Sequence, residues 1–91
     1  MSLHLIFSPA GARACLHRWS AGDHILLLGD GVYAANQLMQ SHVPVNAIHM
    51  LANDAEARGM TAREQGSIGL IDYKQFVGLT EKHSPVVSWK D

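Results

Sequence analysis

The chain has 91 residues, of which 47% are hydrophobic and only 16% are charged, so it forms one domain that buries roughly 60–65% of the surface exposed by its unfolded form. Its formal net charge of -1, from 7 basic and 8 acidic residues, gives no electrostatic basis for direct capture of nucleic acid. A single cysteine excludes an internal disulfide framework, and the small charged share indicates apolar surface reserved for subunit interfaces.

The first half of the chain alternates short apolar runs with helical patterns. Residues 3–7 are β-branched and aromatic and end at a Ser-Pro pair, which predicts a strand. Apolar residues recur at helical spacing over 10–19, which predicts a helix that buries one face. The apolar run 25–28 predicts a buried strand, followed by a Gly-Asp-Gly turn and a helix over 32–40. A Pro ends that helix before a third strand at 45–50.

The next segment contains a short helix and an irregular stretch. Asn53 or Asp54 is expected to cap a helix that runs through Arg58, and Gly59 stands where a helix closes in the left-handed conformation. Residues 60–67 are polar and irregular, so no element is predicted there.

The last segment has the pattern of strand, helix, strand. Residues 68–71 predict a fourth strand, and Asp72 with Gln75 three residues later has the pattern of a capping box that opens a helix. This helix is expected to end near residues 82–83, and residues 85–89 predict a terminal fifth strand.

Five strands alternating with four helices predict an α/β fold with a mostly parallel sheet, because each crossover returns the chain to the same end of the sheet. Helices are expected to cover both faces, which gives a three-layer α/β/α arrangement. Since such crossovers are right-handed, the winding must reverse once, and a reversal creates a crevice at the carboxyl ends of the strands. The loop at residues 29–32 opens at this edge.

That loop matches a dinucleotide fingerprint. Residues 29–34 read Gly-Asp-Gly-Val-Tyr-Ala, the pattern G-x-G-x-x-A, in which glycines let a backbone approach pyrophosphate. The chain is short for a paired nucleotide fold, however, and Asp30 places a negative charge where phosphate would lie. An ordinary strand-to-helix turn is the preferred interpretation, and a small nucleotide-binding module stays open as an alternative.

Cys15 is the one residue able to carry sulfur as a thiolate or persulfide. Arg13, His17 and Arg18 are close enough in sequence to lower its pKa if they turn toward it. Its position in the apolar stripe of the predicted helix, however, favours a buried and inert thiol.

The histidines and serines predict no further chemistry. The six histidines lack H-x-x-x-H spacing and register with carboxylates, so no metal site and no cofactor are expected. No G-x-S-x-G elbow exists, which argues against a serine hydrolase. The amino terminus lacks the basic start and long apolar stretch of a signal peptide, and no run spans a bilayer, so a cytoplasmic protein without membrane contact is expected.

A series of short motifs along the chain resembles the TusB/DsrH family. The individual motifs are weak, but their order and spacing cover almost all of residues 1–91, which the resemblance assigns to one domain of this kind. The motifs are Leu3-His4, Ser8-Pro9, Asp30-Gly31-Val32-Tyr33-Ala34-Ala35, Ala57-Arg58-Gly59, Ile71-Asp72-Tyr73, Phe76-Val77, Leu79-Thr80 and Trp89.

The resemblance implies a subunit of a hetero-hexamer that relays persulfide sulfur. In the Tus branch the partners are TusC- and TusD-like subunits, a TusA-like donor and a TusE-like acceptor, and the sulfur ends in 2-thiouridine at the tRNA wobble position. In the Dsr branch the corresponding DsrE-, DsrF- and DsrC-like proteins serve sulfur oxidation. The main sulfur-accepting cysteine belongs to the TusD/DsrE subunit, which implies a structural or accessory role here.

Within this family, Cys15 matches a cysteine of DsrH-like members that some TusB proteins lack, so it is the candidate persulfide carrier. The leading hypothesis is an accessory, non-catalytic subunit in tRNA thiolation, and the alternative is a DsrH-like subunit in sulfur oxidation with Cys15 reactive. Apolar residues near strand ends and helix starts are candidates for partner docking. These are Tyr33, Leu51, Met60 and Ile68.

Overall fold

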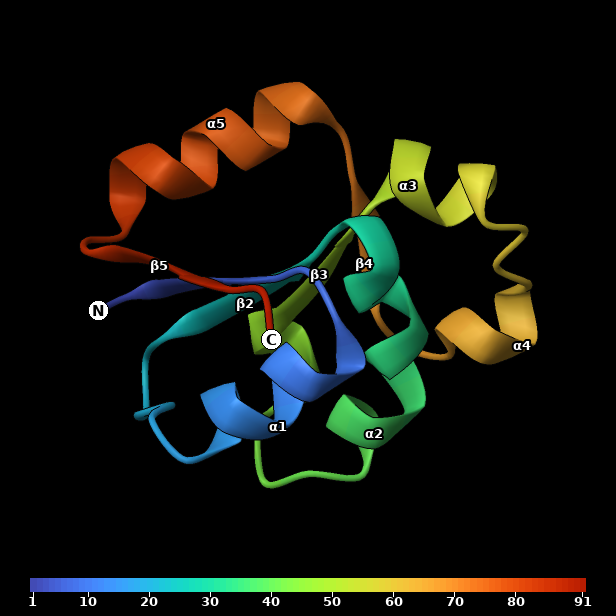
Figure 1. The fold of residues 1–91 in the computed structure, drawn as a ribbon. Coiled ribbons are helices and arrows are strands. Elements are labelled where there is room, and N and C mark those ends of the chain that lie inside the picture. The colour runs from blue at the N-terminus through green and yellow to red at the C-terminus, as the bar shows by residue number, and fades with distance from the viewer.

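A computed structural model describes residues 1–91 as a five-stranded sheet with helices on both faces. The strand order is β4-β3-β2-β1-β5 and every neighbouring pair is parallel, as the alternating pattern predicts. β1 lies at the reversal of winding, between β2 and β5 (Figure 1). The elements in chain order are β1 (Leu3–Ile6), α1 (Pro9–Leu16), β2 (His24–Leu27), η1 (Gly29–Ala34), α2 (Ala35–Met39), η2 (Val45–Ala47), β3 (Ile48–Leu51), α3 (Ala52–Ala57), α4 (Ala62–Gln65), β4 (Gly69–Ile71), α5 (Tyr73–Lys82) and β5 (Val86–Trp89).

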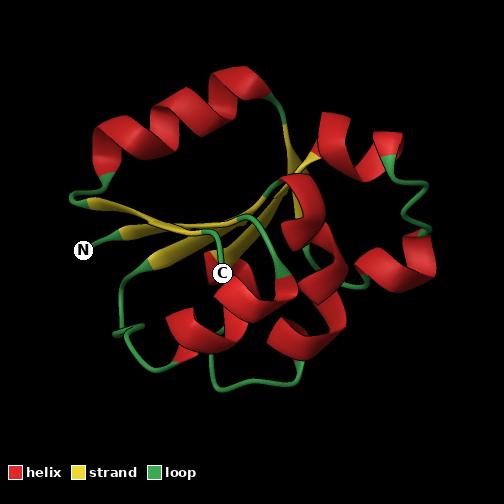
Figure 2. Ribbon diagram, viewed as in Figure 1, coloured by secondary structure: helices red, strands yellow, loops and turns green.

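The two faces of the sheet are covered unequally. α1 and α2 pack on one face and α5 crosses the other, which gives the expected three layers (Figure 2). The α1/α2 face holds a core cluster of 15 buried residues, whereas the cluster on the α5 face has only 5. α5 itself contains no fully buried residue. None of the helices has the length and apolar character needed to cross a membrane.

The carboxyl end of β5 packs against the start of α1 and the turn that precedes it. Gly11 in α1 lies so close to the last strand that a Cβ there would be 2.4 Å from the Trp89 carbonyl oxygen. The Phe7 N–H donates to the same oxygen at 3.0 Å. Ser8 caps α1 through the Gly11 N–H and also donates its hydroxyl to the Lys90 carbonyl, at 2.7 Å. The amino end of α1 and the carboxyl end of the chain therefore stabilise each other.

Several predicted boundaries change because tertiary contacts override local propensity. The helix expected at 10–19 ends at Leu16, and the one expected at 32–40 is a 3₁₀ turn followed by the short α2. The strand expected at 45–50 begins only at Ile48, after the 3₁₀ turn η2. The tight turn η1 is imposed by Gly31, where a Cβ would lie 1.9 Å from the Ile6 carbonyl oxygen.

The capping predictions have mixed outcomes. Asp72 and Gln75 form the predicted reciprocal capping box of α5, and Gly59 closes α3 with φ of 65°. Neither Asn53 nor Asp54 caps α3, because the helix already begins at Ala52, with Leu51 at the N-cap position and no side-chain cap. The segment 60–67 is not wholly irregular, since it contains α4 with a capping box of its own.

Candidate functional site

The loop after β2 is occupied by contacts within the chain. Gly29 adopts the left-handed conformation with φ of 55°, and its N–H donates to the Asp54 carboxylate at 2.7 Å. Asp30 pairs with Arg58 at 2.9 Å, and Gly31 allows the close approach to Ile6 described above. The Gly29 amide and the close approach at Gly31, which a pyrophosphate would need, are thus used for contacts within the chain. The carboxylates of Asp30 and Asp54 lie beside them. The geometry therefore gives no support to the dinucleotide interpretation.

Cys15 lies on the inner side of α1 and is 0% exposed. It belongs to the larger core with Ala12 and Ile25, so the basic neighbours in sequence do not form a reactive environment around its sulfur. Burial, and secondarily the negative charge of Asp23, raise the pKa of the Cys15 thiol to about 12. A thiol in this position is protonated at neutral pH and has no direct path to a donor sulfur.

A buried polar network joins β1, the turn before β2 and β5. The His4 side chain is bonded at both ring nitrogens: Nε2 lies 2.9 Å from Asp23 Oδ2, and the Trp89 indole N–H donates to Nδ1 at 3.0 Å. Because indole can only donate, Nδ1 accepts and Nε2 donates its proton to the carboxylate. Asp23 also accepts from the Ser2 and Ser20 backbone N–H groups. Burial raises the pKa of Asp23, but these hydrogen bonds, first that from His4, lower it overall.

Three histidines from distant parts of the chain meet beneath the carboxyl end of α5. His24 Nδ1 and His49 Nε2 are 2.8 Å apart, and the His83 ring lies over His24 with a centroid distance of 4.4 Å. His83 Nδ1 is buried without a hydrogen-bond partner. Burial lowers the pKa values of His24 and His49 below their ordinary range, and the neighbouring histidines lower them further. No group of side chains in the structure is arranged to hold a metal ion.

The spacing rules for metal motifs missed this histidine cluster because its members are far apart in sequence. Parallel pairing aligns His49 with Leu26, so His24 and His49 lie on the same face of neighbouring strands, two residues apart in register. This alternation along adjacent strands was a usable signal. The position of His83 over His24 depends on the length of α5, so the spacing of histidines along the sequence could not predict it.

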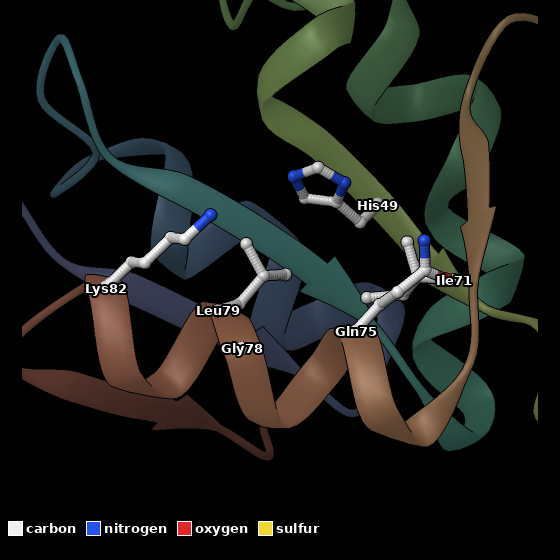
Figure 3. A pocket seen from close by; sticks show the side chains of 6 residues that line it. All are labelled: His49, Ile71, Gln75, Gly78, Leu79 and Lys82. Carbon is white, nitrogen blue, oxygen red and sulfur yellow. The ribbon is translucent and has the colours of Figure 1, made fainter.

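A groove between α5 and the sheet adjoins the histidine cluster. It has a volume of about 290 Å³. Figure 3 shows the side chains of Gln75, Leu79 and Lys82 projecting from α5 toward His49 on β3. The lining residues are His49, Ile71, Gln75, Gly78, Leu79 and Lys82, among which there is no carboxylate.

The four candidate docking residues fall into two groups. Tyr33 is 56% exposed and lines a small hollow of about 110 Å³ together with Met60. Leu51 and Ile68 are each 1% exposed, because one packs under α5 and the other in the larger core. The expectation of an exposed patch therefore does not hold for Leu51 and Ile68. Tyr33 and the partly buried Met60 line the same surface hollow.

Comparison with known proteins finds one family that matches most of the chain. The family described as "DsrH like protein" matches residues 7–86. Protein TusB of Serratia proteamaculans is 41% identical over 81 residues, and Protein TusB of Escherichia coli O81 is 43% identical over 81 residues. Each of these alignments covers 84% of this chain and 84% of the relative.

A solved structure is similar to this fold over most of both chains. Protein Tm0979 from Thermotoga maritima, determined by solution NMR, superposes with a TM-score of 0.68 at 25% sequence identity. The similarity covers 90% of this chain and 93% of that one. The fold of the chain is therefore that of a known small α/β protein. The family match and the relatives above 40% identity identify the chain as a member of the TusB/DsrH family.

Proposed function

We propose that this chain is a structural subunit of a cytoplasmic, TusBCD-like hetero-hexamer that passes persulfide sulfur toward 2-thiolation of the tRNA wobble uridine. The observation that carries the proposal is the family match over residues 7–86 together with TusB relatives at 41–43% identity. Its partners in this proposal are TusC- and TusD-like subunits, with a TusA-like donor and a TusE-like acceptor acting on the complex.

The burial of Cys15 supports a structural role over a carrier role. Sulfur passes between persulfide carriers when a thiolate attacks the terminal sulfur of a donor persulfide and the donor thiolate leaves. The 0% exposed Cys15, with its pKa of about 12, offers neither thiolate nor access for this step. In the proposed complex the sulfur is therefore carried by a cysteine of another subunit.

The surface around Tyr33 is the proposed docking site for a partner subunit. Tyr33 presents an exposed aromatic ring beside Met60, and aromatic and Met side chains are enriched at protein interfaces. Glu64 lines the same hollow and supplies a polar edge. An apolar centre with a polar rim is the arrangement expected of a subunit contact.

Co-expression tests the assembly directly. The chain is produced with its TusC- and TusD-type partners, one subunit is tagged, and the mass of the purified complex is measured. Equal amounts of the three subunits are expected, and Tyr33→Asp is expected to lose the partners while Gln40→Asp, an exposed residue outside the hollow, retains them. A wild-type chain that purifies alone as a stable monomer contradicts the proposal.

Complementation tests the pathway and the role of the thiol. A strain that lacks this gene is expected to lose 2-thiouridine from its tRNA, as measured by mass spectrometry of nucleosides, and to regain it with either wild type or Cys15→Ala. Failure of Cys15→Ala, in a variant shown to fold and assemble, contradicts the structural role. A persulfide adduct on native Cys15 would instead favour the DsrH-like carrier in sulfur oxidation.

A further inference from the structure

α5 presents both apolar and polar side chains to the groove. Residues 75, 78, 79 and 82 follow helical spacing and line the groove, so they form the side of α5 that faces β3 (Figure 3). A helix that covers a sheet normally directs apolar side chains inward. Phe76 and Leu79 follow this rule and pack against the smaller core cluster, whereas Gln75 and Lys82 lie exposed at the edge of the groove. The groove is therefore bordered by polar side chains that are open to solvent and to a ligand.

The presence of glycine at position 78 is not explained by packing. It lies inside α5, where glycine is the least favourable residue after proline. A Cβ at Gly78 would meet no atom within 4 Å, so neither a close approach nor a turn requires glycine there. Its effect is to leave the middle of the groove open.

The groove contains hydrogen-bond donors at both ends. Gln75 Oε1 accepts from the Asp72 N–H at 2.9 Å, which leaves the Nε2 amide group to face the groove. Lys82 supplies a cation seven residues later, about 10 Å along the helix. Ile71 and Leu79 provide apolar surface in the groove. This lining suits an elongated amphipathic molecule with an anionic end at Lys82.

The histidine cluster adds a proton-dependent charge to the Lys82 end. The 2.8 Å contact between His24 and His49 needs one bridging proton, and a second proton on the pair would place two cations side by side. Lys82 and His49 line the same groove, and the buried Nδ1 of His83 has no partner. An anion bound here would offset added positive charge.

Other charged groups around the cluster do not supply that counter-charge within the groove. From the turn before β2, Asp23 acts on His24 but already holds His4 and two backbone amides on the far side of the sheet. On α5, Asp72 is engaged in the helix cap and Glu81 is outside the lining. The carbonyl of the amino-terminal residue Met1 accepts from the Ser84 N–H, next to His83.

We propose that the groove between α5 and β3 is a binding site for a small amphipathic carboxylate, whose binding is coupled to proton uptake by the paired side chains of His24 and His49. The carboxylate pairs with Lys82 and the protonated histidine pair, the apolar body lies on Leu79, and an acceptor at the far end meets Gln75. The volume of about 290 Å³ is just below the range of about 300–1,000 Å³ for drug-sized ligands, which suits a small molecule. This site is independent of the proposed sulfur relay.

Titration with hexanoate, followed by amide and imidazole NMR shifts, tests the site. Hexanoate is expected to shift the groove residues and to bind about fivefold more tightly at about pH 6 than at about pH 8, because a bound anion raises the pKa of the paired His24 and His49. Hexanamide, the uncharged analogue, is expected to produce no saturable shift. EDTA in every sample excludes an adventitious metal.

Variants separate the parts of the claim. Lys82→Gln is expected to weaken hexanoate binding at both pH values, and His49→Gln to remove its pH dependence. Lys74→Gln and His17→Gln, exposed residues outside the groove, are the matched controls and are expected to bind as wild type. Gly78→Leu introduces a good helix-forming residue and fills the groove, so hexanoate binding by this variant is expected to disappear.

Three results would each overturn the proposal. These are the absence of saturable shifts in the groove with wild type at about pH 6, equal binding of hexanamide, and an unchanged pH dependence in a folded His49→Gln variant. The spectrum of each variant reports whether it is folded, so a loss of binding by a folded variant is informative. None of these results bears on partner co-purification or tRNA thiolation.

Discussion

The thiol of Cys15 provides the sharpest quantitative prediction, because its reactivity follows from burial and pKa together. A thiol with a pKa of about 12 in place of the ordinary 9.0 has about a thousandfold less thiolate at neutral pH. Its 0% exposure adds the requirement that the core open locally before a reagent can enter. The native chain is therefore expected to react with a disulfide reagent at least about a thousandfold more slowly than the unfolded chain.

The assay compares 5,5′-dithiobis(2-nitrobenzoate) with the native protein and with the protein in guanidinium chloride. Release of one thiolate per chain is expected at once in denaturant and only over a long period without it. Cys15→Ala is the control and is expected to release none under either condition. A native rate within about tenfold of the denatured rate would refute the reasoning, because it would require an accessible or ionised sulfur.

Three further predictions concern stability, measured as the free energy of unfolding in urea. Gly31→Ala is expected to cost about 3 kcal/mol because its Cβ collides with the Ile6 carbonyl, whereas Gly78→Ala is expected to add about 0.5–1 kcal/mol through helix propensity; equal effects would contradict the geometry. Asp23→Asn is expected to cost about 2–3 kcal/mol at neutral pH. Since the folded pKa of Asp23 is lowered, its contribution is present above about pH 3.9 and lost as the pH falls through the folded value, so a cost that persists unchanged in acid would be inconsistent. Because the pKa values of His24 and His49 are lowered in the folded chain, the free energy of unfolding is expected to be highest above about pH 6.5 and to decline below it. The double variant with glutamine at both positions is expected to show a smaller decline, measured by pH titration at low anion concentration.

Much of the fold follows from patterns that act locally. Short apolar runs separated by crossovers leave parallel pairing as the consistent solution, and the Asp72 and Gln75 capping box identifies the start of α5. The same rule would have identified α4 from Thr61 and Glu64. That segment was predicted to be irregular because it has no apolar periodicity, and α4 indeed buries no residue.

The candidate sites depended on long-range contacts that local patterns do not contain. The glycines after β2 resembled a phosphate loop, but Gly31 serves the approach of Ile6 and the Gly29 amide binds Asp54, 25 residues away. The histidine cluster combines residues from two strands and the end of a helix. Burial of Cys15, by contrast, was predictable from its place in the apolar stripe of α1.

The unequal covering of the two faces of the sheet sets an order in which the molecule can loosen. Most of the buried residues lie beneath α1 and α2, while α5 crosses the opposite face without a fully buried side chain. Such a helix can separate from the sheet at a lower free energy than global unfolding. The amide hydrogens of α5 should then exchange with solvent ahead of those of β1 and β2. The sheet with α1 and α2 would form the stable part of the chain, and α5 the part that opens first.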